Sequence, residues 1–329
     1  MIGVLGAGAW GTALAQLLAA HHPVTLWARD PALAAAIGET RENAAYLPGV
    51  TLSRRIHVTS ELAFAADALL AVVPAQHLGA VLASLPRGGT PLILCAKGIE
   101  AGSHRLMHEV AAAACPDRPI AVLSGPTFAG EVARGLPTAA TVAHGDLAVA
   151  ERLAALFAGS TLRPYTSTDV IGAEIGGAVK NVLAIACGVA EGAGLGSNAR
   201  AALIARGFAE MSRFGLARGA RVETLAGLAG LGDLVLTCSS VQSRNFSLGV
   251  GIGRGERAAD LLANRRTVAE GAATAPVLLS AAAAAGVEMP VTAAVCRLLA
   301  GEEARAIVRA LLARPLRGED DALERERDR

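Results

Sequence analysis

The sequence predicts an α/β protein in which a doubly wound, mostly parallel sheet is followed by a second, all-helical domain. In the first half of the chain, short β-branched runs alternate with alanine-rich helical stretches, which is typical of a parallel sheet covered on both faces. From residue 169 onward, apolar residues keep helical spacing and no clear strand follows. The length of 329 residues also corresponds to about two domains.

The first domain, residues 1–168, is expected to repeat a strand followed by a helix. The expected strands are short apolar runs at 1–5, 23–27, 68–73, 91–95, 119–123 and 139–143. The helices that follow them are expected at 12–20, 31–38, 75–85, 103–114, 128–135 and 146–158. Because a helix separates each strand from the next, the strands are expected to run mostly parallel.

The second domain, residues 169–318, is expected to contain helices alone. Apolar spacing predicts helices within 171–194, 201–219, 265–286 and 291–313. The last eleven residues, 319–329, carry nine charges of both signs and are expected to form a solvated, disordered tail.

The composition of the chain argues against several classes of protein. Hydrophobic residues make up 53% of the sequence and charged residues 18%, so a sizeable core can form and overall disorder is not expected. Aromatic residues are only 3% and the net charge is +1, which argues against a nucleic-acid binder. No unbroken apolar stretch reaches the roughly 18 residues of a membrane span. The first residues run straight into a strand, so a cytoplasmic location without a membrane span is expected.

Neither a disulfide framework nor a metal site is expected. The five cysteines are widely spaced, and no Cys-x-x-Cys pair is present. His104 and His108 have the i, i+4 spacing of one helical face, but no third ligand lies nearby in the sequence. We therefore expect these two histidines on an exposed helical face.

A glycine-rich loop follows the first strand and opens the first helix. Residues 6–11 read Gly-Ala-Gly-Ala-Trp-Gly, the G-x-G-x-x-G pattern of a Rossmann-like dinucleotide-binding fold. In such a loop Gly6 makes the tight turn, Gly8 lets a pyrophosphate approach the backbone, and Gly11 lets helix and strand pack closely. Amide groups at the start of the helix then face the phosphates, so a dinucleotide is the expected cofactor.

The end of the second expected strand bears on the choice between NAD and NADP. An acidic residue here binds the free ribose 2′-hydroxyl of NAD, whereas an arginine pairs with the 2′-phosphate of NADP. The chain offers both, Arg29 and then Asp30. Asp30 could bind the ribose of NAD or simply cap the following helix. The choice between the two cofactors therefore stays open, with NADP favoured.

Polar residues interrupt apolar or glycine-rich surroundings at five places, which are the candidates for chemistry. Lys97 and the segment 124–127 each follow an expected strand, at the edge where open α/β sheets bind ligands. Lys180 lies within an apolar helix, where burying a cation costs free energy unless an opposite charge pairs with it, so it has either such a partner or a function. The remaining places are Asp233 in a glycine-rich segment and the Ser-Arg-Asn run at 243–245.

Motifs from Ile2 to about Leu312 resemble one family. They are GAGAWGTALA, ENAAYLPGV, CAKGIE, LSGPTFAGEVA, EIGGAVKNVLAIACGVAEG, NARAALI, GLAGLGDLVLTCSS, SRN and VAEG. This set is similar to the NAD(P)-dependent glycerol-3-phosphate dehydrogenase family of the bacterial type. The resemblance implies a soluble, commonly dimeric enzyme that interconverts sn-glycerol 3-phosphate and dihydroxyacetone phosphate and supplies the backbone of membrane phospholipids.

The resemblance also implies roles for individual residues, with Lys180 as the catalytic proton carrier. Substrate contacts are implied for Lys97, Gly125, Thr127, Lys180, Asn181, Asp233, Ser243, Arg244 and Asn245. Cofactor contacts are implied for Gly6, Gly8, Ala9, Trp10, Gly11, Arg29, Lys97, Ala129, Arg244, Val268 and Glu270. Ala9 stands where the family often has serine, so only backbone contacts to the cofactor are expected there.

The residue types fit hydride transfer to a ketone. Negative charge develops on the ketone oxygen, so a proton donor must lie within hydrogen-bond reach. Burial can lower the pKa of Lys180 from about 10.4 toward neutrality. Lys97 would lower that pKa further, whereas Asp233 would oppose the shift while orienting the ammonium group, so the net direction stays open. Arg244 is the best phosphate ligand, because a bidentate pair fixes orientation as well as charge.

Other functions stay open at this point. A 3-hydroxyacid or 6-phosphogluconate type dehydrogenase also pairs a dinucleotide fold with a helical domain bearing a lysine, but such enzymes act on carboxylates. A non-catalytic nucleotide-sensing protein would keep the glycine loop and lack a working proton carrier. Lys180 beside Asn181 argues against the sensor, although Lys180 and Asp233 could also be a structural ion pair.

Overall fold

The structure is a computed structural model that describes residues 1–263 and 269–314. Val268 and the expected tail at 319–329 lie outside the described residues. The chain divides into two units, the first formed by Met1–Glu100 and Arg105–Glu174, the second by Ala101–His104 and the residues from Ile175 onward. The division falls inside helix α7 (Val170–Gly192), whereas the sequence-based boundary at 168 lies just before this helix begins.

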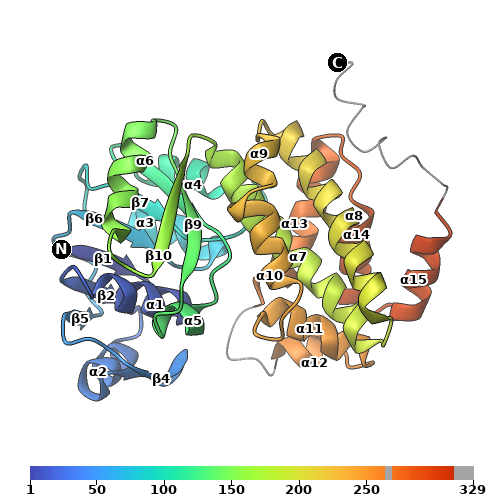
Figure 1. The fold of residues 1–329 in the computed structure, drawn as a ribbon, viewed down its shortest axis with the longest axis horizontal. Helices are drawn as coiled ribbons and strands as arrows, with labels where there is room; N and C mark the ends of the chain where they lie inside the picture. Colours follow the sequence, from blue (N-terminus) through green and yellow to red (C-terminus); the bar gives the residue numbers. More distant parts are fainter. Residues whose placement is uncertain (264–268, 315–329) are drawn as a thin grey trace. The chain divides into compact units, whose positions relative to one another are not determined.

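The first unit is built on one eight-stranded sheet (Figure 1). The strands lie in the order β10-β9-β8-β7-β6-β1-β2-β5, and every neighbouring pair is parallel except β8 with β9. Their bounds are β1 (Ile2–Leu5), β2 (Val24–Trp27), β5 (Ile56–Thr59), β6 (Ala68–Ala71), β7 (Leu92–Leu94), β8 (Ile120–Ser124), β9 (Thr138–Ala143) and β10 (Leu162–Ser167). β3 (Glu42–Asn43) and β4 (Leu47–Thr51) form a separate antiparallel pair. The predicted α/β fold with a mostly parallel sheet is confirmed.

Helices connect these strands and cover the sheet. They are α1 (Ala9–Leu18), α2 (Pro31–Thr40), α3 (Leu78–Ala83), α4 (Met107–Ala114), α5 (Ala129–Ala133) and α6 (Leu147–Ala154), with single 3-10 turns η1 (Ala75–His77) and η2 (Ala155–Phe157). α1 packs on α5, and α3 packs on α4. The central strands β1, β2 and β6 are buried along their whole length, as the apolar runs predict.

One expectation about the histidines is wrong. Helix α4 begins at Met107, so His104 precedes it, with a left-handed backbone at φ 57°. His104 and His108 therefore do not share a helical face. The structure also shows two edge strands, β5 and β10, that the sequence did not predict. Both are partly exposed, and β10 contains Pro164, so neither gives the apolar run of a central strand.

Every element of the second unit within the described residues is a helix or helical turn, as expected. Besides α7 these are α8 (Gly196–Ala217), α9 (Val222–Leu225), the π-helical turn η3 (Leu228–Gly232), α10 (Asp233–Thr237), α11 (Arg244–Gly253), α12 (Ala258–Ala263), α13 (Glu270–Ala284), α14 (Pro290–Leu299) and α15 (Ala304–Leu312). The expected helix at 291–313 is broken near Gly301, whose φ of +97° ends helical geometry.

Helix α7 forms the core of this unit. Among the described residues it is the one helix long and apolar enough, by length and composition, to cross a membrane. Its most apolar window is 89% buried inside the structure, which is the behaviour of a core helix. α7 approaches α11 at backbone distance, because a Cβ on Gly188 would lie 2.1 Å from the Phe246 carbonyl oxygen. A Cβ on Gly249 would likewise lie 2.1 Å from the Ile185 oxygen, so glycine on both helices permits this crossing.

Candidate active site

The glycine-rich loop between β1 and α1 has the geometry of a dinucleotide cradle. Gly6 has φ +116°, which favours glycine, and its amide donates to the Trp27 carbonyl oxygen at 3.0 Å. A Cβ on Gly11 would lie 1.8 Å from the Gly6 oxygen, so only glycine lets α1 start this close to the loop. A Cβ on Gly8 would meet nothing within 4 Å. The space before the first amides of α1 is thus suited to a pyrophosphate.

A buried asparagine that the sequence analysis missed holds this loop. Asn43 is 0% exposed, and its Nδ2 donates to the Ala7 carbonyl oxygen at 2.9 Å and to Thr12 Oγ1 at 2.8 Å. The motif ENAAYLPGV contained it, but nothing local in that motif indicates a partner more than thirty residues away. Asn43 therefore fixes the loop and the first turn of α1 to each other.

The other expected cofactor residues of the first unit lie at the starts of helices or after strands. Ala9 opens α1 and Ala129 opens α5, while Trp10 is partly buried against the core. Asp30 accepts a hydrogen bond from the Ala32 amide at 2.9 Å, so it caps α2. Arg29 is exposed and lies two residues after the end of β2. Of the two neighbours, the aspartate is therefore engaged in the fold, and the arginine presents its charge to solvent.

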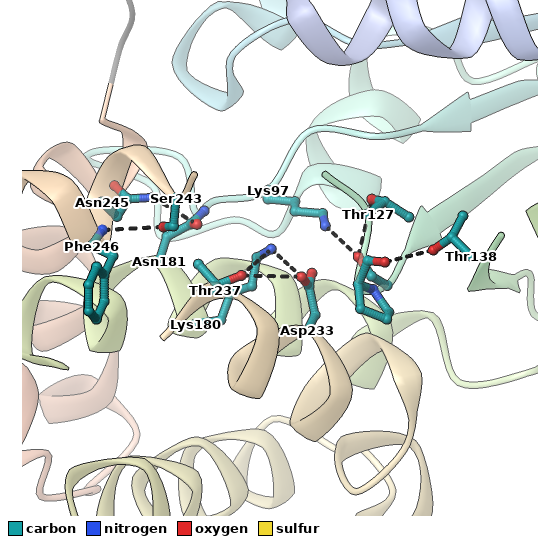
Figure 2. Close-up of polar contacts among 12 residues, drawn as sticks. Lys97, Thr127, Thr138, Lys180, Asn181, Asp233, Thr237, Ser243, Asn245 and Phe246 are labelled. Atoms are coloured by element: carbon teal, nitrogen blue, oxygen red, sulfur yellow. Dashed lines mark hydrogen bonds and ion pairs between the residues drawn. The ribbon is translucent and has the colours of Figure 1, made fainter. Parts of the chain in front are cut away.

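The carboxyl ends of β7 and β8 bring Lys97 and the segment 124–127 together, as the topology predicts. Lys97 Nζ donates to the Gly125 carbonyl oxygen at 3.2 Å, and Thr127 Oγ1 donates to the same oxygen at 3.3 Å. Figure 2 shows both side chains. A Cβ on Gly125 would lie 2.8 Å from the Ala140 Cα, so a glycine is required against β9.

Lys180 lies in a buried polar cluster of the second unit (Figure 2). It is 7% exposed, and its Nζ donates to Asp233 Oδ1 at 2.5 Å and to Thr237 Oγ1 at 3.1 Å. Asp233 is 0% exposed, and Thr237 Oγ1 also donates to its Oδ1 at 3.3 Å. The Asp233 and Thr237 oxygens therefore fix the orientation of the Lys180 ammonium group.

Thr237 is a further residue that sequence reasoning missed. It lies four residues after Asp233 on α10, which places both side chains on one helical face. That spacing is the signal that could have found it once Asp233 was a candidate.

Glycines explain how Asp233 reaches α7. The π-helical turn η3 runs directly into α10, and a Cβ on Gly230 within it would lie 1.9 Å from the Leu225 oxygen. On α7, a Cβ on Gly176 would lie 2.3 Å from the Ala229 oxygen. The glycine-rich segment that contains Asp233 therefore lies against the backbone of α7.

A second cluster links α7, α11 and α13. Asn245 Nδ2 donates to Asn181 Oδ1 at 2.9 Å, and Asn245 Oδ1 accepts from the Gly271 amide at 2.9 Å. Ser243 caps α11 by accepting from the Phe246 amide at 3.2 Å. Arg244, the first residue of α11, is exposed, and Glu270 opens α13 half-buried. The predicted Ser-Arg-Asn run therefore forms the beginning of a helix, where amides and a guanidinium suit an anion.

Two buried cysteines are poor candidates for a nucleophile. Burial raises the pKa of the Cys95 thiol to about 12, and it raises the pKa of Cys238 well above its usual range. All five cysteines are free. Within residues 1–263 and 269–314, no group of three His, Cys, Asp or Glu side chains could hold a metal ion.

Family models match both units. The N-terminal model of NAD-dependent glycerol-3-phosphate dehydrogenase matches residues 1–150, and the C-terminal model matches residues 169–308. The chain belongs to this family. The predicted resemblance is thus confirmed over nearly the whole sequence, and the bound dinucleotide of the family is NAD or NADP.

Relatives of the family cover the chain almost completely. A protein named glycerol-3-phosphate dehydrogenase [NAD(P)+] 1 from Sphingopyxis alaskensis is 62% identical over 321 residues, covering 96% of this chain and 97% of the relative. A second, from Erythrobacter litoralis, is 61% identical and covers 98% of each. The crystal structure of glycerol-3-phosphate dehydrogenase from Coxiella burnetii superposes with a TM-score of 0.91 at 38% identity, covering 95% of this chain and 98% of that one.

Proposed function

We propose that this chain is a glycerol-3-phosphate dehydrogenase that transfers hydride between NADH or NADPH and dihydroxyacetone phosphate, giving sn-glycerol 3-phosphate reversibly. The observation that carries the proposal is the buried Lys180, whose Nζ contacts Asp233 and Thr237. Two relatives named for this activity are 62% and 61% identical to the chain, which supports the same reaction.

The first unit is assigned to the cofactor. Gly8 and the first amides of α1 would hold the pyrophosphate, because the open space at Gly8 lets an anion reach the helix start. Ala9, Trp10, Gly11 and Ala129 lie on the same loop and helix starts. The bound nicotinamide ring supplies the hydride.

The second unit is assigned to proton transfer. As hydride reaches the carbonyl carbon, the carbonyl oxygen gains charge and takes a proton from Lys180 Nζ. In the reverse direction the neutral amine accepts the hydroxyl proton of sn-glycerol 3-phosphate. Asp233 and Thr237 hold the nitrogen in place during both steps, because each accepts one of its hydrogen bonds. The second cation, Lys97, polarises the carbonyl.

The beginning of α11 is assigned to the substrate phosphate. Arg244 offers a planar fork that pairs with two phosphate oxygens. Ser243 and Asn245 order the same turn by capping α11 and bonding to Asn181. A bidentate pair of this kind holds the phosphate in one orientation.

A substrate panel tests the proposed function. Purified protein is mixed with NADPH or NADH and with dihydroxyacetone phosphate, a 3-oxoacid, or no ketone, and absorbance loss at the nicotinamide band is followed. We expect oxidation only with dihydroxyacetone phosphate. Turnover with the 3-oxoacid would instead indicate a carboxylate-specific dehydrogenase, and no turnover with either would indicate a nucleotide sensor.

Four finer features belong to the same proposal. Exposed Arg29 beside the engaged Asp30 favours NADP, so kcat/KM should be higher with NADPH than with NADH.

We infer a homodimer, which light scattering would test against a monomer. We also propose a cytoplasmic location and a role in supplying the backbone of membrane phospholipids.

A further inference from the structure

Glu174 is a buried carboxylate that the proposed chemistry does not use. It is 4% exposed and lies near the start of α7, at the last position of the first unit. Its Oε1 accepts from the His108 backbone amide at 2.8 Å, and its Oε2 lies 2.6 Å from His108 Nδ1. Both carboxylate oxygens thus engage one residue of another helix.

This contact caps helix α4. His108 is the second residue of α4, so its amide lies in the first turn, where an α-helix has no internal acceptor. The residue before the helix, Leu106, has no side-chain acceptor to offer, and Glu174 supplies one from α7. A carboxylate at this end also complements the helix dipole. Glu174 and His108, here called the α4–α7 clasp, therefore tie the first turns of α7 to α4.

The clasp lies close to Lys180 along one continuous helix. Lys180 follows Glu174 by six residues, which corresponds to about 9 Å of helix rise. The division between the two units falls directly after Glu174, so α7 leaves the first unit at the clasp. Glu174 and Lys180 lie on the same continuous helix, so an anchor on its first turns restrains the turns that lead to Lys180.

We propose that the α4–α7 clasp is a positioning pair for the proton carrier. This inference rests on the proposed function, because it assigns Lys180 the proton transfer. Glu174 and His108 act through the helix and not on the substrate. Without the clasp, the start of α7 can shift, and a shift of about 1 Å at a proton donor can cost about a hundredfold in rate.

The test is Glu174→Ala with steady-state kinetics and nucleotide binding. We expect kcat to fall about tenfold or more, while the Kd for NADPH stays within about twofold, because the glycine loop is untouched. Glu174→Gln keeps an acceptor for the His108 amide and should lose less. His108→Ala removes the ring contact to Glu174 and keeps the backbone amide that Glu174 accepts from. The double variant should be no worse than Glu174→Ala alone, as expected for two residues that act as one pair.

Glu210→Ala is the matched control. Glu210 is 1% exposed and caps α14 by accepting from the amides of Val291 at 2.5 Å and Thr292 at 3.1 Å. It is thus the same kind of buried, helix-capping carboxylate, but it lies on α8 and not on the helix of Lys180. We expect Glu210→Ala to lower the melting temperature and to leave kcat within about twofold of wild type.

The outcomes separate the two proposals. Wild-type kcat in a folded Glu174→Ala protein, or an equal kcat loss in Glu210→Ala, would overturn the clasp while the dehydrogenase stands. An inactive wild type would overturn the dehydrogenase. In that case hydrogen exchange still tests the anchoring: amides of α7 near residues 175–182 should exchange faster in Glu174→Ala, and in Glu174→Gln to a smaller extent, than in Glu210→Ala. Unchanged exchange of these amides in Glu174→Ala would refute the anchoring of α7 by Glu174.

Discussion

At the scale of single residues, the cluster around Lys180 explains how a cation is held inside an apolar helix. Removing an ammonium and a carboxylate from water costs several kcal/mol per ion, and their attraction offsets this cost only with good geometry and further hydrogen bonds. Asp233 and Thr237 provide both, since each oxygen lies within 3.1 Å of Nζ. The cluster therefore contributes orientation more than stability.

Thr237→Val tests this orientation. The substitution keeps the shape and removes the hydroxyl that bonds to Lys180 Nζ. A hydrogen bond to a charged group contributes about 1.5–3 kcal/mol, so we expect kcat to fall at least about tenfold. The control is Thr292→Val, which removes a buried hydroxyl bonded to Glu210. It should lower stability alone, and equal kcat losses in the two variants would contradict the role of Thr237.

Arg244→Ala tests the phosphate site. The guanidinium would bind the phosphate equally in the ground and transition states, so its loss should mainly raise KM for dihydroxyacetone phosphate, by about tenfold or more. Arg254, exposed at the opposite end of α11, provides the matched control. Arg254→Ala should leave KM unchanged. If Arg244→Ala also left it unchanged, the phosphate would have to bind elsewhere.

Glu210 predicts a pH dependence of stability. Burial raises its pKa from 4.5 to about 7, although hydrogen bonds from Val291 and Thr292 and the nearby Arg213 oppose the shift. The folded state therefore favours the neutral acid. The stabilisation of the folded state by this group is fully present below pH 4.5 and is lost as the pH rises through about 7. The shift corresponds to about 3 kcal/mol.

Urea unfolding at pH 5 and pH 8 measures this effect. Glu210→Gln cannot titrate, so the free energy of unfolding of the wild type should fall relative to that of the variant between these two pH values. A constant difference, or a wild type that gains relative stability at pH 8, would show that the carboxylate is ionised in the folded protein.

At the scale of elements, glycine determines how closely α7 and α11 approach. The crossing depends on Gly188 and Gly249, where a Cβ would lie 2.1 Å from a carbonyl oxygen of the other helix. This close packing also brings Asn181 of α7 within hydrogen-bond distance of Asn245 of α11. The crossing of α7 and α11 thus connects the helix of the proposed proton carrier with the proposed phosphate site.

Gly188→Ala should therefore destabilise the protein by about 1–3 kcal/mol, because a methyl group has no space in the crossing. Gly38→Ala is the control, since Gly38 lies in α2 with nothing within 4 Å of its Cβ position. Alanine is the better helix former, so this variant should gain up to about 1 kcal/mol. Thermal unfolding compares the two, and a tolerated Gly188→Ala would argue against a close crossing.

Elements also differ in how well the sequence predicts them. Central strands such as β1 and β6 are buried on both faces and read as apolar runs. The edge strand β5 has only Ile56 fully buried, so its sequence looks like a loop. Helix α4 begins later than its alanine-rich pattern suggested, because His104 has a left-handed backbone and Leu106 is extended and forms a β-bridge with Ile99.

At the scale of the whole molecule, the order of the expected strands and helices predicted the architecture. Polar residues within apolar or glycine-rich segments indicated the candidate site residues. Lys180 and Asp233 stand out because they are charged residues in apolar or glycine-rich segments. Asn43 and the pair of Glu174 and His108 were not predicted, because each depends on a partner 31 to 66 residues away. Contacts of that kind leave no periodic or local signal.

The central claim for the molecule is a division of labour, in which the first unit binds the dinucleotide and Lys180 of the second carries the proton. Lys180→Ala tests it most directly, by measuring turnover of dihydroxyacetone phosphate and NADPH affinity on the same folded protein. We predict a loss of turnover of about 10²–10⁴-fold with the Kd for NADPH nearly unchanged. Wild-type turnover in this variant would contradict the claim.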